Sequence, residues 1–433
     1  MKLLSTNTCR IPKDLSSVTD TGPEELATAG GMTPAQVQRI WQATESLYKT
    51  GNHPMISICV RRKGHIVLNR AIGHAAGNSP DDRKDTPKRP ALTTTPVCLF
   101  SASKVVTAML VHMLDERGEL NLLDPVSHYL PEFAANGKRK ATIFHLLSHR
   151  GGIPKIDGDV SPELLFDQPA ILKRLMQASP TSPSGHRLAY HALSAGYILG
   201  AIIEKVTGQD LRTFLHEHIE IPMEMRHFNF GLRPEFRNEV SISAATGVHP
   251  ALGTDHYLNH VLGGGLQLAV DVTNDPRFYE TISPAANLYT SAEEAGRFFE
   301  MLLNGGQYNG KQIFSPETVF RATLETTRPS IDHTLMVPMR YALGPMLGAN
   351  PVGLYGPMTG AAFGHIGFTN IFCWADPARD ISASILTTGK AVVGTHIPAL
   401  ANLLAKMSSQ CPTLPHAERR SVFGRSQAEA VPI

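Results

Sequence analysis

The first strong hydrophobic pattern in the chain begins at Thr33-Pro34, where a residue suited to cap a helix precedes a proline suited to its first turn. Apolar residues then recur at the three- and four-residue spacing of a helix with one buried face. These residues are Val37, Ile40, Trp41, Leu47 and Tyr48. Two apolar runs, 55–60 and 66–68, follow on either side of Lys63-Gly64-His65, and together they predict a β-hairpin.

The middle of the chain has helical periodicity in several segments. One such segment directly follows Ser101, and the others are 142–149, 155–180, 190–220 and 291–303. Glycines close several of these segments, as at Gly151-Gly152 and Gly305-Gly306. Between them, residues 226–290 are rich in loop-forming residues, and we expect this part and the loop at 330–360 to shape a pocket.

Strand patterns return near the C-terminus. Segments 361–371, 372–376 and 381–388 alternate or run apolar between Gly, Pro and Asp, and a helical segment follows at 396–407. Strands therefore lie at both ends of the chain and helices between them. The simplest fold is α+β, with one antiparallel sheet built from both chain ends, flanked by helices, and a mostly helical lobe inserted.

This pattern predicts one catalytic domain with less regular segments at either end. We expect a flexible leader at 1–31, the domain at 32–408 and a polar tail at 409–433. Within the domain, an α/β lobe would combine about 32–95 with about 335–408, and the helical lobe would cover about 96–334.

Composition narrows the class of protein. The 433 residues carry a formal net charge of +2 with both signs interspersed, which argues against a nucleic-acid-binding surface. The five cysteines are widely spaced without a C-x-x-C pair, which favours buried thiols in a reducing compartment over disulfides or zinc ligands. The N-terminus lacks the apolar core of a secretory signal, and no apolar run is long enough to span a membrane. We therefore expect a soluble, cytoplasmic protein.

The candidate chemistry is concentrated at Ser101 and Lys104, at the start of the apolar helical segment. Residues three apart lie on one face of a helix, so the hydroxyl and the amine can meet. Burial would lower the pKa of the lysine until its neutral amine can accept a proton. A serine hydroxyl needs such a neighbouring base to become a nucleophile, and this is the S-x-x-K arrangement of penicillin-recognising serine enzymes.

Two other patterns offer competing candidates. Ser194 lies in Ala192-Leu193-Ser194-Ala195-Gly196, which resembles G-x-S-x-G but lacks the first glycine and falls inside a helical pattern. His145 and His149 are four residues apart and could face one metal ion, yet no third ligand stands at a suitable spacing. We therefore expect packing and capping roles for these residues.

Further motifs along the chain resemble those of the serine β-lactamase-related superfamily, in the same order and over roughly residues 35–405. Its first motif is similar to Phe100–Lys104, and the T-I-x-H-L-L-S/T-H-x-S-G segment to residues 142–152. Its second motif, Y-x-N or Y-x-x, is similar to Tyr190-His191-Ala192, and its third, K-T-G or H-x-G, to His365-Ile366-Gly367. The resemblance is closest to the class C-type branch, with its family VIII carboxylesterases and β-lactamase-like esterases.

The resemblance implies a role for each matching residue. Ser101 would be the acylated nucleophile, with Lys104 and Tyr190 sharing the general-base role, or with Tyr190 relaying a proton between Lys104 and the leaving group. The backbone N–H groups of Ser101 and Phe368 would form the oxyanion hole. Gly367 would let the strand approach the acyl group closely, because glycine has no Cβ.

Two positions depart from the β-lactamase pattern. Ala192 stands where β-lactamases carry an asparagine that binds the amide side chain of the antibiotic, and His365 where they carry a lysine that helps to hold its carboxylate. A histidine at that place is common in the esterase branch.

We therefore predict a serine hydrolase that cleaves short-chain carboxylic esters through an acyl-enzyme, without metal or organic cofactor. Its partner would be a small-molecule ester, or a β-lactam, with no nucleic acid and no membrane span. The alternatives with the same site are a β-lactamase or D-amino-acid peptidase and an acyltransferase. A different class is an inactive scaffold of the same fold. The sequence does not identify the natural substrate or the oligomeric state.

Overall fold

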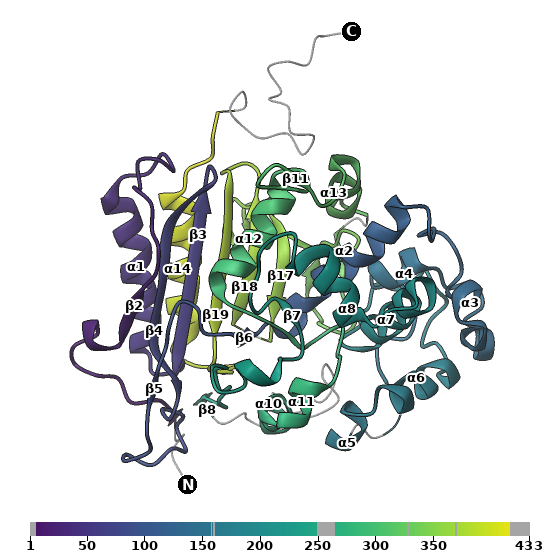
Figure 1. Ribbon diagram of the computed structural model, residues 1–433, viewed down its shortest axis with the longest axis horizontal. Coiled ribbons are helices and arrows are strands. Elements are labelled where there is room, and N and C mark those ends of the chain that lie inside the picture. The colour runs from purple at the N-terminus through teal and green to yellow at the C-terminus, as the bar shows by residue number, and fades with distance from the viewer. Residues whose placement is uncertain are drawn as a thin grey trace.

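The computed structural model describes residues 6–156, 158, 161–248, 265–326, 329–368 and 370–415. Its centre is an antiparallel sheet in the order β14-β17-β18-β19-β3-β4-β2, with β5 also paired to β4 (Figure 1). The strands are β2 (Thr19–Thr21), β3 (Met55–Arg62), β4 (His65–Ala76), β5 (Arg89–Pro90), β14 (Met346–Leu347), β17 (Phe363–Gly367), β18 (Ile371–Asp376) and β19 (Ile381–Thr387). Because β19 pairs with β3, both ends of the chain build one sheet, as predicted.

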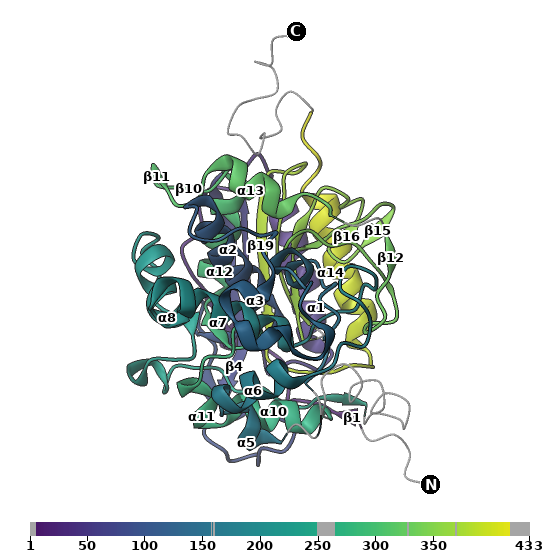
Figure 2. The ribbon, with the colours of Figure 1, turned by 90° about the vertical axis from the view of Figure 1, so that its right-hand side faces the viewer.

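Helices cover both faces of this sheet. Helices α1 (Pro34–Lys49) and α14 (His396–Gln410) lie side by side on one face, and α12 (Ala292–Leu303) lies on the other (Figures 1 and 2). Alternation along β19 explains this arrangement, since Ile385 packs in the core beneath α1 and α14. On the opposite side, Ser382 donates a 2.9 Å hydrogen bond to the Gly296 carbonyl of α12.

Local sequence signals account for the ends of several elements. Thr33 and Gln36 form a reciprocal capping box at the start of α1, with Pro34 in the first turn. The β3–β4 hairpin turns at Lys63 and Gly64, both with positive φ, which suits a tight two-residue turn.

The remaining helices pack beside the sheet, and most of them are at the right of Figure 1. They are α2 (Ser103–Glu116), α3 (Val126–Tyr129), α4 (Ile143–Leu147), α5 (Pro162–Leu165), α6 (Gln168–Gln177), α7 (Ser194–Thr207), α8 (Leu211–Leu215), α10 (Leu266–Asn274), α11 (Pro276–Glu280) and α13 (Pro316–Thr323). Short strands complete the fold: β6 (Val97–Cys98), β7 (Asn229–Phe230) and β9 (Leu288–Thr290) in one sheet, and the pairs β1 (Thr6–Asn7) with β8 (Gly247–Val248), β10 (Gln307–Tyr308) with β11 (Lys311–Gln312), β12 (Ser330–Ile331) with β13 (Pro338–Met339), and β15 (Val352–Gly353) with β16 (Gly356–Pro357).

At both chain ends, the described parts of the expected flexible leader and polar tail pack against the domain. β2 forms the edge of the main sheet, and Glu24 pairs with Arg70 on β4 at 2.8 Å, so the described part of 1–31 is docked. At the other end, Leu414 is buried and its N–H bonds to the Ala378 carbonyl. Residues 1–5 and 416–433 lie outside the described residues.

Two predicted helices are shorter in the structure. The segment predicted at 142–149 is helical only over α4, because His149 takes a positive φ of 57°. The segment predicted at 190–220 becomes helical at Ser194, so Tyr190 lies on an irregular stretch before α7. The loop-rich part at 226–290 contains α10 and α11, and its residues 249–264 lie outside the described ones.

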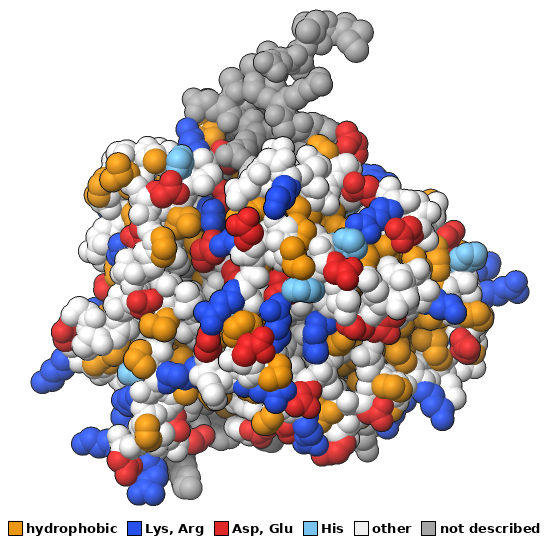
Figure 3. Space-filling model, in the orientation of Figure 1, with side chains coloured by type: hydrophobic (Ala, Val, Ile, Leu, Met, Phe, Trp, Pro, Cys, Tyr) orange, Lys and Arg blue, Asp and Glu red, His pale blue; other side chains and the backbone are white. Residues whose placement is uncertain are grey.

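The structure agrees with two expectations from composition, buried thiols and interspersed surface charges. All five cysteines are free and buried. Acidic and basic side chains are interspersed on the face in Figure 3. Among the described helices, none combines the length and the apolar character that crossing a bilayer requires.

Candidate active site

Ser101 lies in a short 3-10 helix, η2 (Phe100–Ala102), directly before α2. The preceding backbone is fixed to β9, since the Leu99 N–H bonds to the Leu288 carbonyl at 2.8 Å. Phe100 takes a φ of 49°. This conformation is unfavourable for any residue that has a side chain, so contacts with surrounding residues must stabilise it. Its ring stacks on Phe368 at 5.3 Å between centroids.

Lys104, one turn further along, faces Ser101 as the i, i+3 spacing predicts. Its Nζ is 3.0 Å from Ser101 Oγ and 3.1 Å from the Ala285 carbonyl oxygen. Burial away from water disfavours the ammonium form and lowers the pKa of Lys104 to about 7. Near neutral pH, a large fraction of this lysine is therefore an amine that can accept the hydroxyl proton.

Tyr190 reaches the same place from the segment before α7. The Lys104 Nζ lies 5.0 Å from the centroid of its ring, and the phenol hydrogen-bonds with Ser101. Burial raises the pKa of Tyr190 above its usual value, and the negative charge of Asp332 adds to this effect. The side chain is therefore a protonated phenol at neutral pH, able to donate or relay a proton.

Asp332, which the sequence analysis did not single out, anchors this segment. One carboxylate oxygen, Oδ1, accepts hydrogen bonds from the Tyr190 N–H at 3.0 Å and the Thr334 N–H at 2.8 Å, while Oδ2 accepts one from the Tyr341 hydroxyl at 2.9 Å. Asp332 is fully buried. The only hint in the sequence is an Asp suited to bond its own downstream backbone, a common turn signal that says nothing of Tyr190.

The two histidines considered as metal ligands have other contacts. His145 caps α4, where its Nδ1 accepts a hydrogen bond from the Thr142 N–H at 3.2 Å. His149 packs its ring against Tyr190, 4.8 Å between centroids, and its Nδ1 accepts a bond from the His191 N–H. These contacts match the packing and capping roles expected from the sequence.

Strand β17 brings the third motif to Ser101. Gly367 lies so close to η2 that a Cβ there would be 2.1 Å from the Leu99 carbonyl oxygen, so only glycine fits. Phe368 follows, with its ring against that of Phe100. Gly367 and Phe368 thus lie against the two residues that precede Ser101.

His365, on the same strand, is fully buried and lies near Tyr190, 6.1 Å between ring centroids. Its Nδ1 bonds to the Ile366 carbonyl at 2.6 Å, so Nδ1 carries the proton and Nε2 a lone pair. That Nε2 has no hydrogen-bond partner among the described residues. Burial, with Lys104 nearby, lowers the pKa of His365 to about 3. A neutral imidazole therefore stands here, in place of a fixed cation.

Ser194 lies apart from this constellation. It is fully buried at the start of α7, and its hydroxyl donates a 2.6 Å bond to the Ile153 carbonyl. This hydroxyl serves the packing of the lobe.

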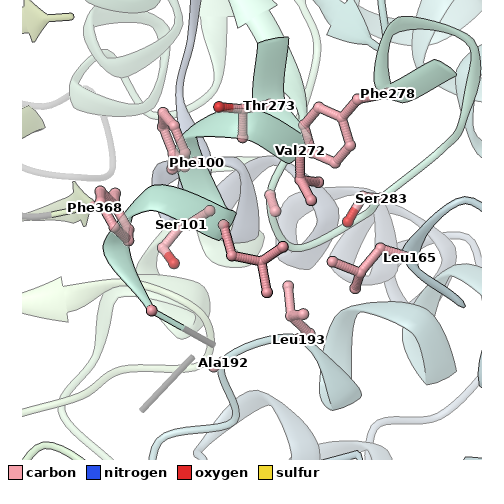
Figure 4. Close-up of a pocket in the computed structure, with 14 residues that line it drawn as sticks. Phe100, Ser101, Leu165, Ala192, Leu193, Val272, Thr273, Phe278, Ser283 and Phe368 are labelled. Carbon is pink, nitrogen blue, oxygen red and sulfur yellow. The ribbon is translucent and has the colours of Figure 1, made fainter. Parts of the chain in front are cut away.

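An apolar pocket opens next to Ser101 and has a volume of about 750 Å³ including its mouth. Figure 4 shows Phe100 and Phe368 on one side of Ser101, with Val272 and Phe278 on the other. Helices α10 and α11 supply much of the second wall, so part of the 226–290 segment shapes the pocket as expected. The remaining lining residues are Leu165, Ala192, Leu193, Gly265, Leu268, Ala269, Thr273, Ser283 and Ala286.

The chain is similar to several known proteins. The chain is 28% identical over 302 residues to the Esterase/beta-lactamase LipL of Mycobacterium tuberculosis, covering 66% of this chain and 68% of that protein. It is 24% identical over 366 residues to an N-acetylmuramyl-L-alanine amidase of Bacillus subtilis, covering 78% and 77%. Among solved structures, a family VIII carboxylesterase matches with a TM-score of 0.72 at 25% identity, covering 86% of this chain and 98% of that one.

The sequence profile of the Beta-lactamase family matches residues 40–405, which include every residue of the site described above. The match thus extends from α1 into α14 and covers both the sheet and the helical lobe. The protein is therefore a serine hydrolase and belongs to the Beta-lactamase family.

Proposed function

We propose that the protein hydrolyses short-chain carboxylic esters through an acyl-enzyme on Ser101. The observation that carries this proposal is the 3.0 Å contact between Lys104 Nζ and Ser101 Oγ, in an environment that lowers the pKa of the lysine to about 7. The amine is near enough to take the proton directly, and its pKa lies close to neutral pH, where a general base is most effective.

In the proposed acylation, neutral Lys104 takes the Ser101 proton as Oγ attacks the ester carbonyl. When the tetrahedral intermediate collapses, the ester C–O bond breaks and the leaving alkoxide needs a proton. Tyr190 donates its phenolic proton and regains one from the Lys104 ammonium, because burial keeps it a phenol. A water molecule then attacks the acyl-enzyme by the same steps in reverse.

The oxyanion of the intermediate is assigned to the backbone N–H groups of Ser101 and Phe368. Two features support this assignment: the close approach of Gly367 to the Leu99 carbonyl, and the stacking of Phe368 on Phe100. Removing one such donor from a hydrolase commonly costs about 3–4 kcal/mol of transition-state stabilisation.

The pocket favours an ester with a short apolar acyl chain over a β-lactam. Its walls are aliphatic and aromatic, so an acyl chain buries apolar surface there. His365 is neutral, so the site lacks a fixed cation at the place that would hold the carboxylate of an antibiotic. The name of the family VIII carboxylesterase also favours an esterase, while that of LipL includes both esterase and β-lactamase.

The test is a paired assay of wild type and Ser101→Ala on p-nitrophenyl butyrate and on the β-lactam nitrocefin. We expect ester turnover to fall about a thousandfold or more in the variant, with little nitrocefin cleavage in either protein. Ester turnover that survives in Ser101→Ala would refute the site. Ser101-dependent nitrocefin cleavage at a comparable rate would keep the site and make the protein a β-lactamase. Faster transfer to an added alcohol than to water would make it an acyltransferase.

A further inference from the structure

A second cavity is lined by basic and hydroxyl side chains. Its volume is about 640 Å³ including its open mouth. The polar side chains that line it are Arg150, Ser182, His186, Arg187, Ser330 and His333. Its described lining includes no Asp or Glu, so the two guanidinium groups give this groove a positive charge at every physiological pH.

The polar groups of this basic groove are not fully used by the protein. Arg187 is exposed and forms no hydrogen bond or ion pair with the described residues. Arg150 is held in place by backbone carbonyls, since its Nη1 donates to those of Gly185 and His186 at 3.4 and 3.3 Å. The Ser330 hydroxyl is buried and lacks a partner among the described residues. Planar guanidinium donors beside a free hydroxyl suit a carboxylate or phosphate.

One short segment connects the groove to the reaction centre. Arg187 and Leu188 line the groove, and Ala192 and Leu193 line the apolar pocket. Tyr190 lies between these two pairs in the sequence. Tyr190 is the third residue after Arg187, so their Cα atoms are at most about 11 Å apart. A linker of a few bonds could therefore join a group at Tyr190 to one in the groove.

The wall of the groove is also tied to the segment that carries Tyr190. The His333 N–H bonds to the Leu188 carbonyl at 2.9 Å, and the adjacent Asp332 accepts the bond from the Tyr190 N–H. The position of the groove is thus fixed relative to Tyr190, the proposed proton donor. A site that holds the leaving oxygen at Tyr190 and a charged group in the groove requires such a fixed arrangement.

We propose that the basic groove binds an anionic group, a carboxylate or phosphate, on the alcohol side of the ester substrate. The inference rests on the proposed function: the acyl chain occupies the apolar pocket, and the alcohol leaves past Tyr190 toward the groove. The natural substrate is then an ester of a short apolar acid with an alcohol or phenol that bears a negative charge.

The experiment compares two esters that differ only in this charge. One is the butyrate ester of 3-(4-hydroxyphenyl)propionic acid, and the other is the butyrate ester of its primary amide. Their hydrolysis is followed by release of the phenol in wild type, Arg187→Gln and Arg139→Gln. Arg139 is exposed and does not line the groove, so its variant changes the net charge equally elsewhere.

We expect wild type to have a KM about tenfold lower for the carboxylate ester than for the amide ester, and added salt to reduce this ratio. Arg187→Gln should bring the ratio close to one, and Arg139→Gln should leave it as in wild type. Equal KM values for both esters in wild type, or equal effects of the two substitutions, would overturn the proposal.

The proposed function can fail separately. Ser101-dependent hydrolysis of the neutral amide ester supports the esterase whatever the charge preference. If neither ester is hydrolysed, calorimetric titration with the two free phenols tests whether the groove binds the anionic group. Tighter binding of the carboxylate than of the amide, lost in Arg187→Gln, then supports the basic groove although the esterase proposal has failed.

Discussion

The pH dependence of turnover tests the role of Lys104 directly. Only the neutral amine can take the Ser101 proton, and its pKa is lowered to about 7 by burial. With that value, about 9% of the enzyme holds a neutral lysine at pH 6, about half at pH 7 and about 91% at pH 8. We therefore expect kcat/KM for p-nitrophenyl butyrate to rise about tenfold from pH 6 to pH 8. The rate should then stay level to pH 9, because the raised pKa of Tyr190 keeps it protonated.

The assay is initial-rate hydrolysis over pH 5.5 to 9.5 at constant ionic strength, with Lys104→Arg as the variant. An arginine keeps the positive charge but does not give up its proton in this range, so activity should be lost at every pH. A flat profile between pH 6 and 8, or an acid limb centred near the ordinary lysine pKa, would refute the reasoning. Activity retained in Lys104→Arg would do so too.

The lowered pKa of Lys104 also makes the free energy of unfolding depend on pH. The pKa of Lys104 falls from 10.5 to about 7 on folding, so between these values the unfolded chain binds more protons than the folded one. Stability therefore rises with pH through this window and is lost as the pH falls toward 7. For this lysine the gain from pH 7 to pH 9 is about 2 kcal/mol. Urea unfolding of wild type and Lys104→Met at both pH values should show a gain smaller by about that amount in the variant.

Three further substitutions test the surroundings of the site. Gly367→Ala should abolish measurable ester turnover and lower the Tm, because its Cβ would lie 2.1 Å from the Leu99 carbonyl oxygen; an active variant would contradict that packing. Asp332→Asn should cost about 1–3 kcal/mol in urea unfolding and lower kcat several-fold, because it weakens the anchor of Tyr190; an unchanged kcat would remove its positioning role. Lys390→Met should lower kcat a few-fold, since it removes a buried amino group that lies 4.5 Å from the centroid of the Phe100 ring; equal kcat values would show that Lys390 does not position this ring.

Much of the fold could be predicted because its long elements carry their own signals. The helix after Thr33 had both a cap and an apolar face, and the strands near the C-terminus were bounded by turn residues. The docked N-terminal segment could not be predicted in this way. β2 has three residues, too few to show a period, and its place is set by pairing with β4 rather than by its own sequence.

The site was predictable where chemistry depends on local spacing or on motif order. Ser101 and Lys104 are three residues apart, so helical spacing predicted their contact. The third motif lies on a short strand, and its assignment to the same site came from the order of the motifs. Asp332 is 142 residues from Tyr190, and its contact is with a backbone N–H, which leaves no trace in the residue type at position 190. The basic groove combines three distant segments and was equally invisible.

Two buried lysines differ in the number of acceptors around their Nζ atoms. Lys138 is enclosed by the carbonyl oxygens of Ala135, Met176 and Ala178, which replace the water that an ammonium group loses. Lys104 has one carbonyl, that of Ala285, and otherwise the hydroxyl of Ser101. An ammonium with so few acceptors is poorly compensated, so the amine form is favoured, and its lone pair faces the hydroxyl. The missing acceptors are thus what makes Lys104 suited to activate Ser101, and a second carbonyl within reach of its Nζ would raise its pKa and slow the enzyme at neutral pH.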